Sequence, residues 1–309
     1  MSYATILFVI NHIIEIAHSG FHGLSVFVAK GIVALIAKTP SERDLWYERL
    51  FMWHKKLQVM IHSHYFARKL ETNKLIPIIR RALETKDFKK IEEYFYLIGE
   101  QAPTTSIKRR VLILASGMGV RWEASHLKQL APINGKPLIE HLISNVPEAI
   151  VVSHHTRLHK HPHIVPYRHY FVLETILCTM STWEDRTIIL LGDTLYDHAD
   201  LEDILSYDGN FAVFGSKSQV EIFALTFTKE AKEEVLTHLL RALLDAYEGG
   251  RGKITEMYRS YDNLPLYKVG FGSNFHNVNY TTDIDSLKEY EALKEGRPFK
   301  IRYYEEATS

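Results

Sequence analysis

A glycine-rich turn follows an apolar run in the segment RVLILASGMGVRWEASHLKQL, and basic residues come soon after it. The run ends at Leu114, the turn holds Gly117 and Gly119, and Arg121 and Lys128 follow. A turn of this kind after a buried strand lets backbone N–H groups approach phosphate oxygens closely. The arginine adds a planar fork of donors, and the lysine adds a point charge that can neutralise charge on reacting phosphates. The pattern therefore predicts a loop that binds phosphates.

An aspartate at the end of a later apolar run is a second candidate for chemistry. Asp193 follows Gly192 in RTIILLGDTLYDHADLEDIL. A carboxylate just past a buried strand, preceded by a glycine that leaves room for a ligand, is well placed to bind a hard cation that also contacts phosphates. The alternative is an aspartate that caps the following turn. Because we expect Asp193 outside the core, its replacement by alanine should abolish turnover with little effect on thermal stability.

Short apolar runs alternate with helical patterns after about residue 103, and these elements must position the candidate groups. Strands are predicted over residues 110–114, 149–153, 170–173, 187–191, 210–214 and 221–226. Helices are predicted over residues 137–145, 175–183, 201–207, 229–247 and 285–293. Such alternation predicts an α/β domain, a mainly parallel mixed sheet with helices on both faces. Open α/β sheets bind ligands at the carboxyl ends of their strands, where both candidate groups fall.

The first hundred residues differ, because they show helical periodicity and no strand pattern. The polar segment QAPTTSIKRR, which contains Pro103, marks a boundary between an all-helical domain over 1–102 and a catalytic domain over 103–309. Polar residues interrupt the apolar runs around Phe8 and Val26, which fall short of the roughly 18–20 residues of a membrane span. These runs exceed what one small bundle buries, so we expect this region, whose role is otherwise undefined, to rest on the C-terminal domain or on a second copy of itself in a homo-oligomer.

Charge and cysteine content narrow the partners further. Lys plus Arg and Asp plus Glu number 37 each in the 309 residues, so no net field favours nucleic acid or an anionic membrane. Cys178 is the one cysteine, which excludes an intramolecular disulfide and a cysteine-based zinc cluster. A single cysteine also fits a cytoplasmic location. An anionic ligand must therefore be held by a local arrangement of residues.

The full spacing resembles a known family over about residues 108–295. LASGMGVR, then Lys128 in HLKQL, then INGKPLIEHLI are similar to the signature of nucleotidyltransferases that join a nucleoside triphosphate (NTP) to a phosphorylated acceptor. These include sugar-1-phosphate nucleotidylyltransferases, cytidylyltransferases of alcohol phosphates and the molybdenum-cofactor guanylyltransferase-like group. Two positions depart from the pattern. Ser116 stands where the family usually has Ala or Gly, and Leu127 stands where a proline usually precedes the lysine.

The resemblance implies a Rossmann-like fold of the glycosyltransferase-A type and Mg²⁺-dependent transfer of a nucleoside monophosphate (NMP) group, with release of pyrophosphate. The acceptor would be a sugar phosphate or an alcohol phosphate. The implied catalytic residues are Lys128, Arg121 and Asp193. The implied nucleotide-binding residues are Leu114, Ala115, Ser116, Gly117, Gly119, Arg121, Lys128 and Thr175. Asp193 would hold Mg²⁺.

A second Mg²⁺ ligand is implied late in the domain, in FHNVNYTTDIDSLKEYEAL. Asn279 takes that position by the resemblance, and Asp283 is the next alternative. Asn277 and Asp285 lie nearby, although Asp285 better fits the N-cap of the helix that follows.

Two other stretches leave alternatives open. Thr175 contacts the base or ribose by the resemblance, or else it only begins a helix together with Glu174. Six histidines lie within residues 154–169. Three interpretations of this stretch are open. It is a loop that borders the acceptor pocket, a tract that binds a metal, or an inert solvated loop. In the first case basic side chains would bind a phosphate, namely Arg157, Lys160 and Arg168.

The sequence is compatible with other functions, and it defines neither the base of the nucleotide nor the acceptor. The same architecture carries glycosyltransferases that use nucleotide sugars, and a non-catalytic nucleotide-binding or scaffold protein is a further alternative. A transferase of ready-made nucleotide sugars does not need the loop Gly117-x-Gly119-x-Arg121 with Lys128. The loop therefore favours nucleotidyl transfer from an NTP.

Overall fold

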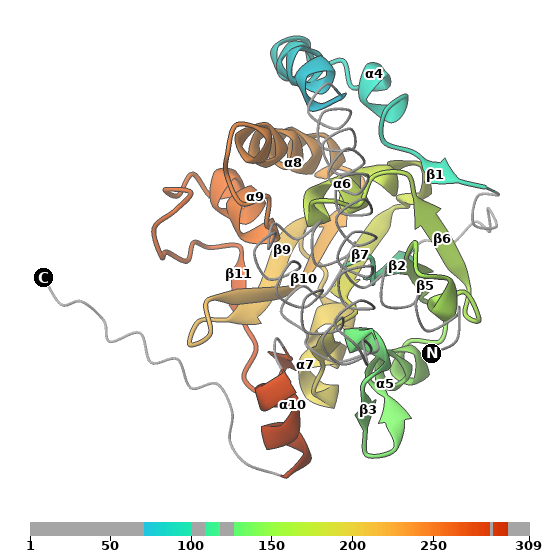
Figure 1. Ribbon diagram of the computed structural model, residues 1–309. Helices are drawn as coiled ribbons and strands as arrows, with labels where there is room; N and C mark the ends of the chain where they lie inside the picture. The colour runs from blue at the N-terminus through green and yellow to red at the C-terminus, as the bar shows by residue number, and fades with distance from the viewer. Residues whose placement is uncertain (1–70, 100–108, 118–126, 285–286, 296–309) are drawn as a thin grey trace, which may run out of the picture. The chain divides into compact units, whose positions relative to one another are not determined.

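The computed structural model describes residues 71–99, 109–117, 127–284 and 287–295 (Figure 1). The chain divides into two compact units, Met1–Leu75 and Ile76–Ser309. The described residues of the first unit, 71–75, are helical. The expected domain boundary between residues 102 and 103 lies outside the described residues and stays a prediction, as do the helices and the self-association expected before residue 71.

Within the described residues of the second unit, eight strands form one sheet. In spatial order they are β1 (Leu97–Ile98), β6 (His163–Pro166), β5 (Ile150–Val152), β2 (Arg109–Leu114), β7 (Arg186–Leu191), β10 (Glu221–Thr228), β9 (Phe211–Ser216) and β11 (Phe275–Asn277). The pairs β6–β5, β5–β2, β2–β7 and β9–β11 are parallel. The pairs β1–β6, β7–β10 and β10–β9 are antiparallel. The prediction of an α/β domain with a mixed, mainly parallel sheet is confirmed.

Helices pack on both faces of this sheet (Figure 1). The helices are α4 (Lys89–Glu92), α5 (Leu138–Asn145), α6 (Val172–Cys178), α7 (His198–Ser206), α8 (Lys232–Tyr247), α9 (Ile254–Tyr261) and α10 (Leu287–Lys294). Short 3₁₀ turns are η1 (Lys128–Leu130), η2 (Thr156–Leu158) and η3 (Met180–Thr182). Two small ribbons complete the unit, β3 (Pro132–Ile133) with β4 (Lys136–Pro137) and β8 (Thr194–Leu195) with β12 (Thr282–Asp283).

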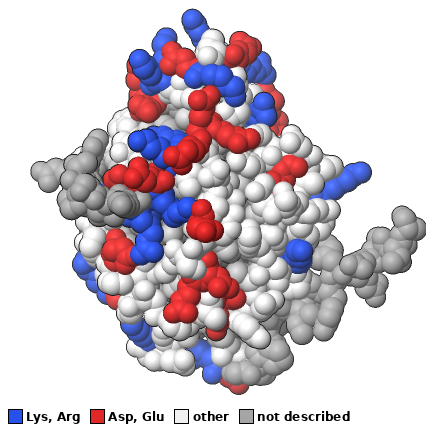
Figure 2. Space-filling model, turned by 180° about the vertical axis from the view of Figure 1, so that it is seen from behind, with Lys and Arg blue, Asp and Glu red and all other residues white. Residues whose placement is uncertain are grey.

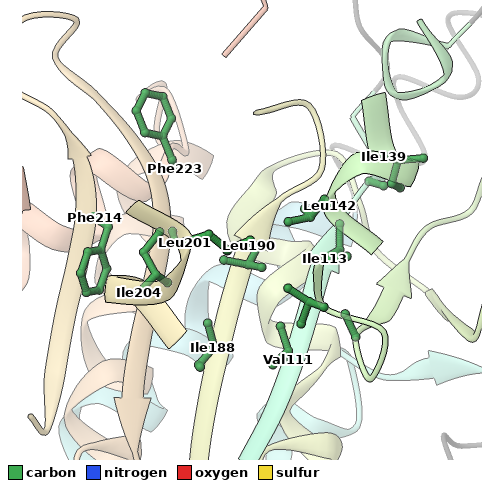
Figure 3. Packing of buried hydrophobic residues seen from close by; sticks show 14 of the residues in the cluster. Val111, Ile113, Ile139, Leu142, Ile188, Leu190, Leu201, Ile204, Phe214 and Phe223 are labelled. Carbon is green, nitrogen blue, oxygen red and sulfur yellow. The ribbon is translucent and has the colours of Figure 1, made fainter. Parts of the chain in front are cut away.

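The core is divided between the two faces because successive side chains of a strand point to opposite sides. Val111 and Ile113 of β2 join Ile188 and Leu190 of β7 in a cluster that also includes side chains of α5 and α7 (Figure 3). Leu112, at 0% exposure, occupies the alternate position of β2 and is covered on the other face. Continuous burial on both faces explains why β2 and β7 read as unbroken apolar runs.

The structure differs from the predicted elements in several places. Residues 170–173, predicted as a strand, instead contain the start of α6 at Val172. The Glu174 carboxylate accepts the backbone N–H groups of Tyr170 and Phe171 at 2.8 and 3.1 Å and caps the helix. Leu97–Ile98, in the stretch expected to be helical, is a strand that pairs with β6. The strands β6 and β11 and the helix α9 are additional to the prediction.

The surface and the helices bear on the expected partners. No helix in the described ranges is long and apolar enough to cross a membrane, while the apolar runs around Phe8 and Val26 fall outside those ranges. Figure 2 shows basic and acidic side chains intermingled over the upper half of the rear face. That face therefore has no broad basic surface there of the kind that binds nucleic acid.

Candidate active site

A cavity of about 340 Å³ opens where β2 and β7 end, at the carboxyl edge of the parallel strands. Its lining comes from these strand ends, the start of β10, and the segments that lead into α6 and α9. Five residues that the sequence assigns to the site line it: Leu114, Ser116, Gly117, Thr175 and Asp193. Gly119 and Arg121 lie outside the described residues. The structure thus brings the end of the glycine turn and the strand-end aspartate to one cavity.

Hydrogen bonds to β5 fix the chain as it leaves β2. The N–H of Ala115 donates to the carbonyl of Val152 at 2.9 Å, and the Ser116 hydroxyl donates to the same carbonyl at 3.2 Å. Ser153 returns a bond from its hydroxyl to the Ala115 carbonyl at 2.9 Å. Among the described residues, a side chain added at Gly117 would meet nothing within 4 Å, so their packing does not require glycine there. Room at Gly117 is what a closely approaching ligand needs.

Gly192 holds the tips of β2 and β7 together. Its N–H donates to the Leu114 carbonyl at 2.8 Å. A Cβ at this position would lie 2.9 Å from that carbonyl oxygen and 3.1 Å from the Cβ of Ala115, so a side chain requires the two strand ends to separate. The glycine before the aspartate therefore places Asp193 directly beside the start of the phosphate loop predicted from the sequence.

Lys128 forms an ion pair with Asp193 across this edge of the sheet. The Lys128 Nζ lies 2.9 Å from the Asp193 Oδ2, and the two side chains are 6% and 35% exposed. The 3₁₀ turn η1, which begins at Lys128, carries the amine inward. Its preceding residue, Leu127, adopts φ −60° and ψ 138°, a backbone conformation open to proline. The departure from the family pattern at Leu127 therefore leaves the chain on the path that a proline would take.

The expected alternatives for a second metal ligand lie in different places. Asp283 lines the cavity together with Asp193, because β12 pairs with β8, where Asp283 lies opposite Thr194. Asn279 instead lines a separate hollow of about 410 Å³ beside the β9–β10 hairpin. The backbone N–H of Asn279 lies 3.4 Å from the buried carboxylate of Asp200, which also accepts the next two N–H groups and so shapes this turn.

The donor set at the cavity fits Mg²⁺. Asp193 and Asp283 supply hard carboxylate oxygens, and magnesium typically takes one or two carboxylates and completes its shell with water and substrate phosphates. No group of three or more His, Cys, Asp or Glu side chains suited to a metal occurs in the described part of the chain. A metal here would consequently depend on the bound substrate for part of its coordination.

Tyr196 supports the tip of β7 from the side of β10. Its hydroxyl accepts the N–H of Leu191 at 2.9 Å and donates to the carbonyl of Phe223 at 2.6 Å. These are the backbone groups that the β7–β10 ladder would otherwise pair at its end. Burial raises the pKa of the Tyr196 hydroxyl far above its ordinary value, so it stays a protonated donor. Tyr196 thereby fixes the strand end that carries Asp193.

The segment before α6 contributes structural and lining residues. Glu174, 4% exposed, caps the helix and also accepts the hydroxyl of Tyr247 at 2.7 Å. Its role is therefore the capping role considered from the sequence. Thr175 is 2% exposed and lines the cavity. The contact of Thr175 with the base or ribose stays a prediction.

Several polar lining residues escape the sequence motifs. Gln129 is 4% exposed, lines the cavity and has an Oε1 atom with no hydrogen-bond partner among the described residues. Its position next to Lys128 in η1 is the one signal that the sequence offers. Glu221 and Lys253 also line the cavity. They come from the start of β10 and the N-cap of α9, and no motif links them.

The histidine-rich stretch borders the cavity through its imidazoles. His169 is a lining residue, and the His155 ring nitrogen lies 3.3 Å from the carbonyl of Gly117. The ring of His154 lies 3.9 Å from each of these two rings, and burial lowers the pKa of His154 to about 3. No group of three or more side chains that could hold a metal ion occurs among the described residues. The interpretation of this stretch as a metal-binding tract therefore has no structural support.

Two of the basic side chains expected to bind a phosphate already have partners. Lys160 pairs with Glu140. Arg168 donates from its Nε to the carbonyl of Tyr94 at 3.1 Å. Neither Lys160, Arg168 nor Arg157 belongs to the lining of the cavity. The part of this stretch that reaches the cavity is therefore histidine and not arginine or lysine.

Comparisons with known proteins find no matching family model and no matching curated protein. The chain is similar in structure to the CTP:phosphocholine cytidylyltransferase of Streptococcus pneumoniae, at 14% identity and a TM-score of 0.43 over 61% of this chain and 99% of that one. It is also similar to a putative glucose-1-phosphate thymidylyltransferase of Bacillus anthracis, at 14% identity and a TM-score of 0.42 over 63% and 98%. An inositol-1-phosphate CTP transferase of T. maritima matches at 14% identity and 0.38 over 63% and 99%. Likenesses at this level assign no activity.

Proposed function

We propose that this chain is a Mg²⁺-dependent nucleotidyltransferase of the glycosyltransferase-A type fold, which transfers an NMP group from an NTP to a phosphorylated small molecule. The observation that carries the proposal is the ion pair of Lys128 with Asp193, 2.9 Å apart at the edge of a cavity that also contains Gly117. A cation, a carboxylate and a glycine turn at the carboxyl edge of parallel strands suit a polyphosphate with its metal. Nucleotide sugars, the substrates of glycosyltransferases, lack the terminal phosphates that such a loop would bind.

Each residue has a role in this proposal. The backbone from Leu114 to Gly117, together with Gly119 and Arg121 by their resemblance, holds the β and γ phosphates. Lys128 stabilises negative charge on the phosphates that react. Asp193 and Asp283 hold Mg²⁺, which neutralises phosphate charge when it is bound. Asn279, the ligand expected first from the sequence, is the weaker candidate because it lines a different hollow.

The proposed reaction depends on the placement of the two substrates and on the neutralisation of phosphate charge more than on acid–base side chains. An oxygen of the acceptor phosphate forms a bond to the α-phosphorus, the bond from that phosphorus to the bridging oxygen breaks, and pyrophosphate leaves with the electron pair. The nucleophile is already ionised at neutral pH, so no side chain has to remove a proton. The strand ends held together at Gly192 supply a rigid frame for in-line attack.

Pyrophosphate release tests the proposal. The full chain is incubated with each of the four NTPs, Mg²⁺ and a panel of phosphorylated acceptors, while binding of each NTP with Mg²⁺ is measured by calorimetry. We expect one NTP to bind and to yield pyrophosphate only when an acceptor is present. Asp193→Asn should abolish the reaction, whereas Asp203→Asn, an exposed aspartate on α7, should not. Failure of all four NTPs to bind would overturn the proposal.

A further inference from the structure

The cavity has a wall beyond Asp193 that the phosphate loop does not form. Because β10 is antiparallel to β7, its first residue lies at the same sheet edge as the end of β7. That residue is Glu221, one strand over from Asp193, and both line the cavity. Lys253 and Thr255 at the start of α9 line it as well. We call Glu221, Lys253 and Thr255 the acceptor wall.

Buried contacts hold the backbone of this wall in place. Glu256, 0% exposed, accepts the N–H of Lys253 at 2.8 Å and is also paired with the guanidinium of Arg251. Gly252 has φ +65°, and a Cβ there would lie 2.3 Å from the ring of Phe171, so this glycine lets the loop cross closely over the start of α6. The chain that presents Lys253 is thus fixed before any ligand binds.

The two charged groups of the wall balance each other without using up their hydrogen-bonding capacity. The Lys253 Nζ lies 3.8 Å from the Glu221 Oε1, and the side chains are 47% and 25% exposed. Direct charge-assisted hydrogen bonds are about 2.7–2.9 Å long, so both groups retain donors and lone pairs for a ligand. The Thr255 hydroxyl adds a group that both donates and accepts. The wall therefore offers donors and acceptors side by side with no net charge.

This chemistry suits hydroxyl groups better than a cation. Each hydroxyl donates one hydrogen bond and accepts others, so neighbouring hydroxyls match a carboxylate beside an ammonium. A quaternary ammonium is recognised by several aromatic faces around it. Phe223 of the cavity lining is 0% exposed, which leaves Tyr170, 52% exposed, as the accessible aromatic ring of the described lining apart from histidine. Glu221 is already balanced by Lys253 and leaves no unpaired negative charge for such a cation.

We infer that the acceptor wall binds the non-phosphate part of the acceptor, and that the acceptor is the phosphate ester of a sugar or another polyol. The inference rests on the proposed nucleotidyl transfer. Glu221 accepts hydrogen bonds from the hydroxyls and Lys253 donates to them, which orients the acceptor phosphate toward the side of Asp193. The position of the wall, one strand from Asp193, leaves the glycine turn free for the NTP.

An acceptor panel separates the chemical classes. The full chain, with its preferred NTP and Mg²⁺, is supplied with hexose 1-phosphates, linear polyol phosphates, phosphocholine and phosphoethanolamine, and pyrophosphate is measured. We expect turnover with a member of the hydroxylated class and at least about a tenfold lower kcat/KM with both amino-alcohol phosphates. A preference for phosphocholine or phosphoethanolamine would overturn the inference while leaving nucleotidyl transfer intact.

Two variants locate the effect. Glu221→Gln and Lys253→Met should each raise the acceptor KM about tenfold, a change expected from one or two charge-assisted hydrogen bonds. The calorimetric Kd for the NTP with Mg²⁺ should stay within about twofold. Lys217→Met, in the separate hollow beside the β9–β10 hairpin, is the matched control and should leave both values unchanged.

The outcomes are distinguishable. An unchanged acceptor KM in both variants, or a change in NTP affinity in place of acceptor KM, would refute the acceptor wall alone. Failure of every NTP to bind the unaltered chain would refute the nucleotidyltransferase proposal, and the acceptor wall would fall with it. Thermal melting of each variant identifies misfolding, and the acceptor panel on the unaltered chain decides the substrate class whether or not a variant folds.

Discussion

Replacing Asp193 by asparagine removes the charge that faces Lys128 while keeping the shape of the side chain. The Lys128 side chain is 6% exposed and that of Asp193 is 35% exposed. Breaking a buried ion pair costs about 3–5 kcal/mol, whereas exposed pairs contribute about 0–1 kcal/mol. Because one partner is buried and the other is partly hydrated, we expect Asp193→Asn to lower the free energy of unfolding by about 1–3 kcal/mol.

A double-mutant cycle isolates this interaction. Lys128→Met keeps a buried apolar stem and removes the ammonium, so the double variant should be more stable than the two single effects predict, by about 1–2 kcal/mol. The matched control is the pair Arg109–Glu148, 2.6 Å apart, whose side chains are 43% and 41% exposed. Arg109→Met and Glu148→Gln should couple by less than about 1 kcal/mol.

Urea unfolding followed by circular dichroism gives the stabilities, and pyrophosphate release gives the activities. We expect every variant that lacks Asp193 or Lys128 to be inactive, including the double variant that regains stability. A coupling energy within about 0.5 kcal/mol of zero would refute the argument that Asp193 compensates a buried charge. The sequence alone led to another expectation, little change in stability, because it does not show the buried lysine behind this strand end.

Five further substitutions test other residues. Asp283→Asn should raise the Mg²⁺ concentration for half-maximal activity about tenfold and Asn279→Ala less than about twofold; the reverse ranking in a Mg²⁺ titration would contradict the ligand assignment. Tyr196→Phe leaves two backbone groups unpaired and should cost about 1–3 kcal/mol in urea unfolding, with a lower kcat at an unchanged NTP Kd. Gly192→Ala should weaken NTP binding in calorimetry, since the added Cβ forces β2 and β7 apart; wild-type affinity would show that the contact relaxes. Burial lowers the pKa of His238 to about 4 from 6.5, so the stability that it contributes is present above pH 6.5 and is lost as the pH falls toward 4. His238→Gln should flatten that part of the melting curve against pH, and an equally steep curve would exclude His238 as the cause.

The sheet was largely predictable because its strands are buried on both faces. Such strands have continuous apolar runs between polar turns, which is why β2, β5, β7, β9 and β10 all fall within two residues of their predicted limits. The edge strands β1 and β11 have two and three residues, too few for any period to show. Short edge strands of this kind depend on pairing partners distant in the chain, so local sequence does not reveal them.

The segment 170–173 shows how one side chain can override a local pattern. Phe171, Val172 and Leu173 are apolar or β-favouring residues and predict a strand. The Glu174 carboxylate satisfies the N–H groups of Tyr170 and Phe171, and this capping bond starts a helix one residue after Phe171. A Glu at the third helical position was recognisable in the sequence. The sequence did not show that its capping bonds would outweigh the strand preference of three apolar residues.

The candidate site was predictable up to the point where two chain segments must meet. Gly117, Lys128 and Asp193 could be identified because each lies within a few residues of a long buried strand or of the motif that follows it. The choice between Asn279 and Asp283 depends instead on the two-residue ladder of β12 with β8 and on the Asp200 carboxylate that shapes the turn at Asn279. Both are contacts between segments roughly eighty positions apart, and side chains in a turn and in the strand after it have no fixed periodicity relative to each other.

Glu221 and Lys253 could not be predicted for the same reason. Only the antiparallel return of β10 and the loop over Phe171 bring these residues to one cavity. Residues that recognise an acceptor are therefore the part of such a site that sequence motifs are least able to supply, since they come from segments that meet only in the folded chain.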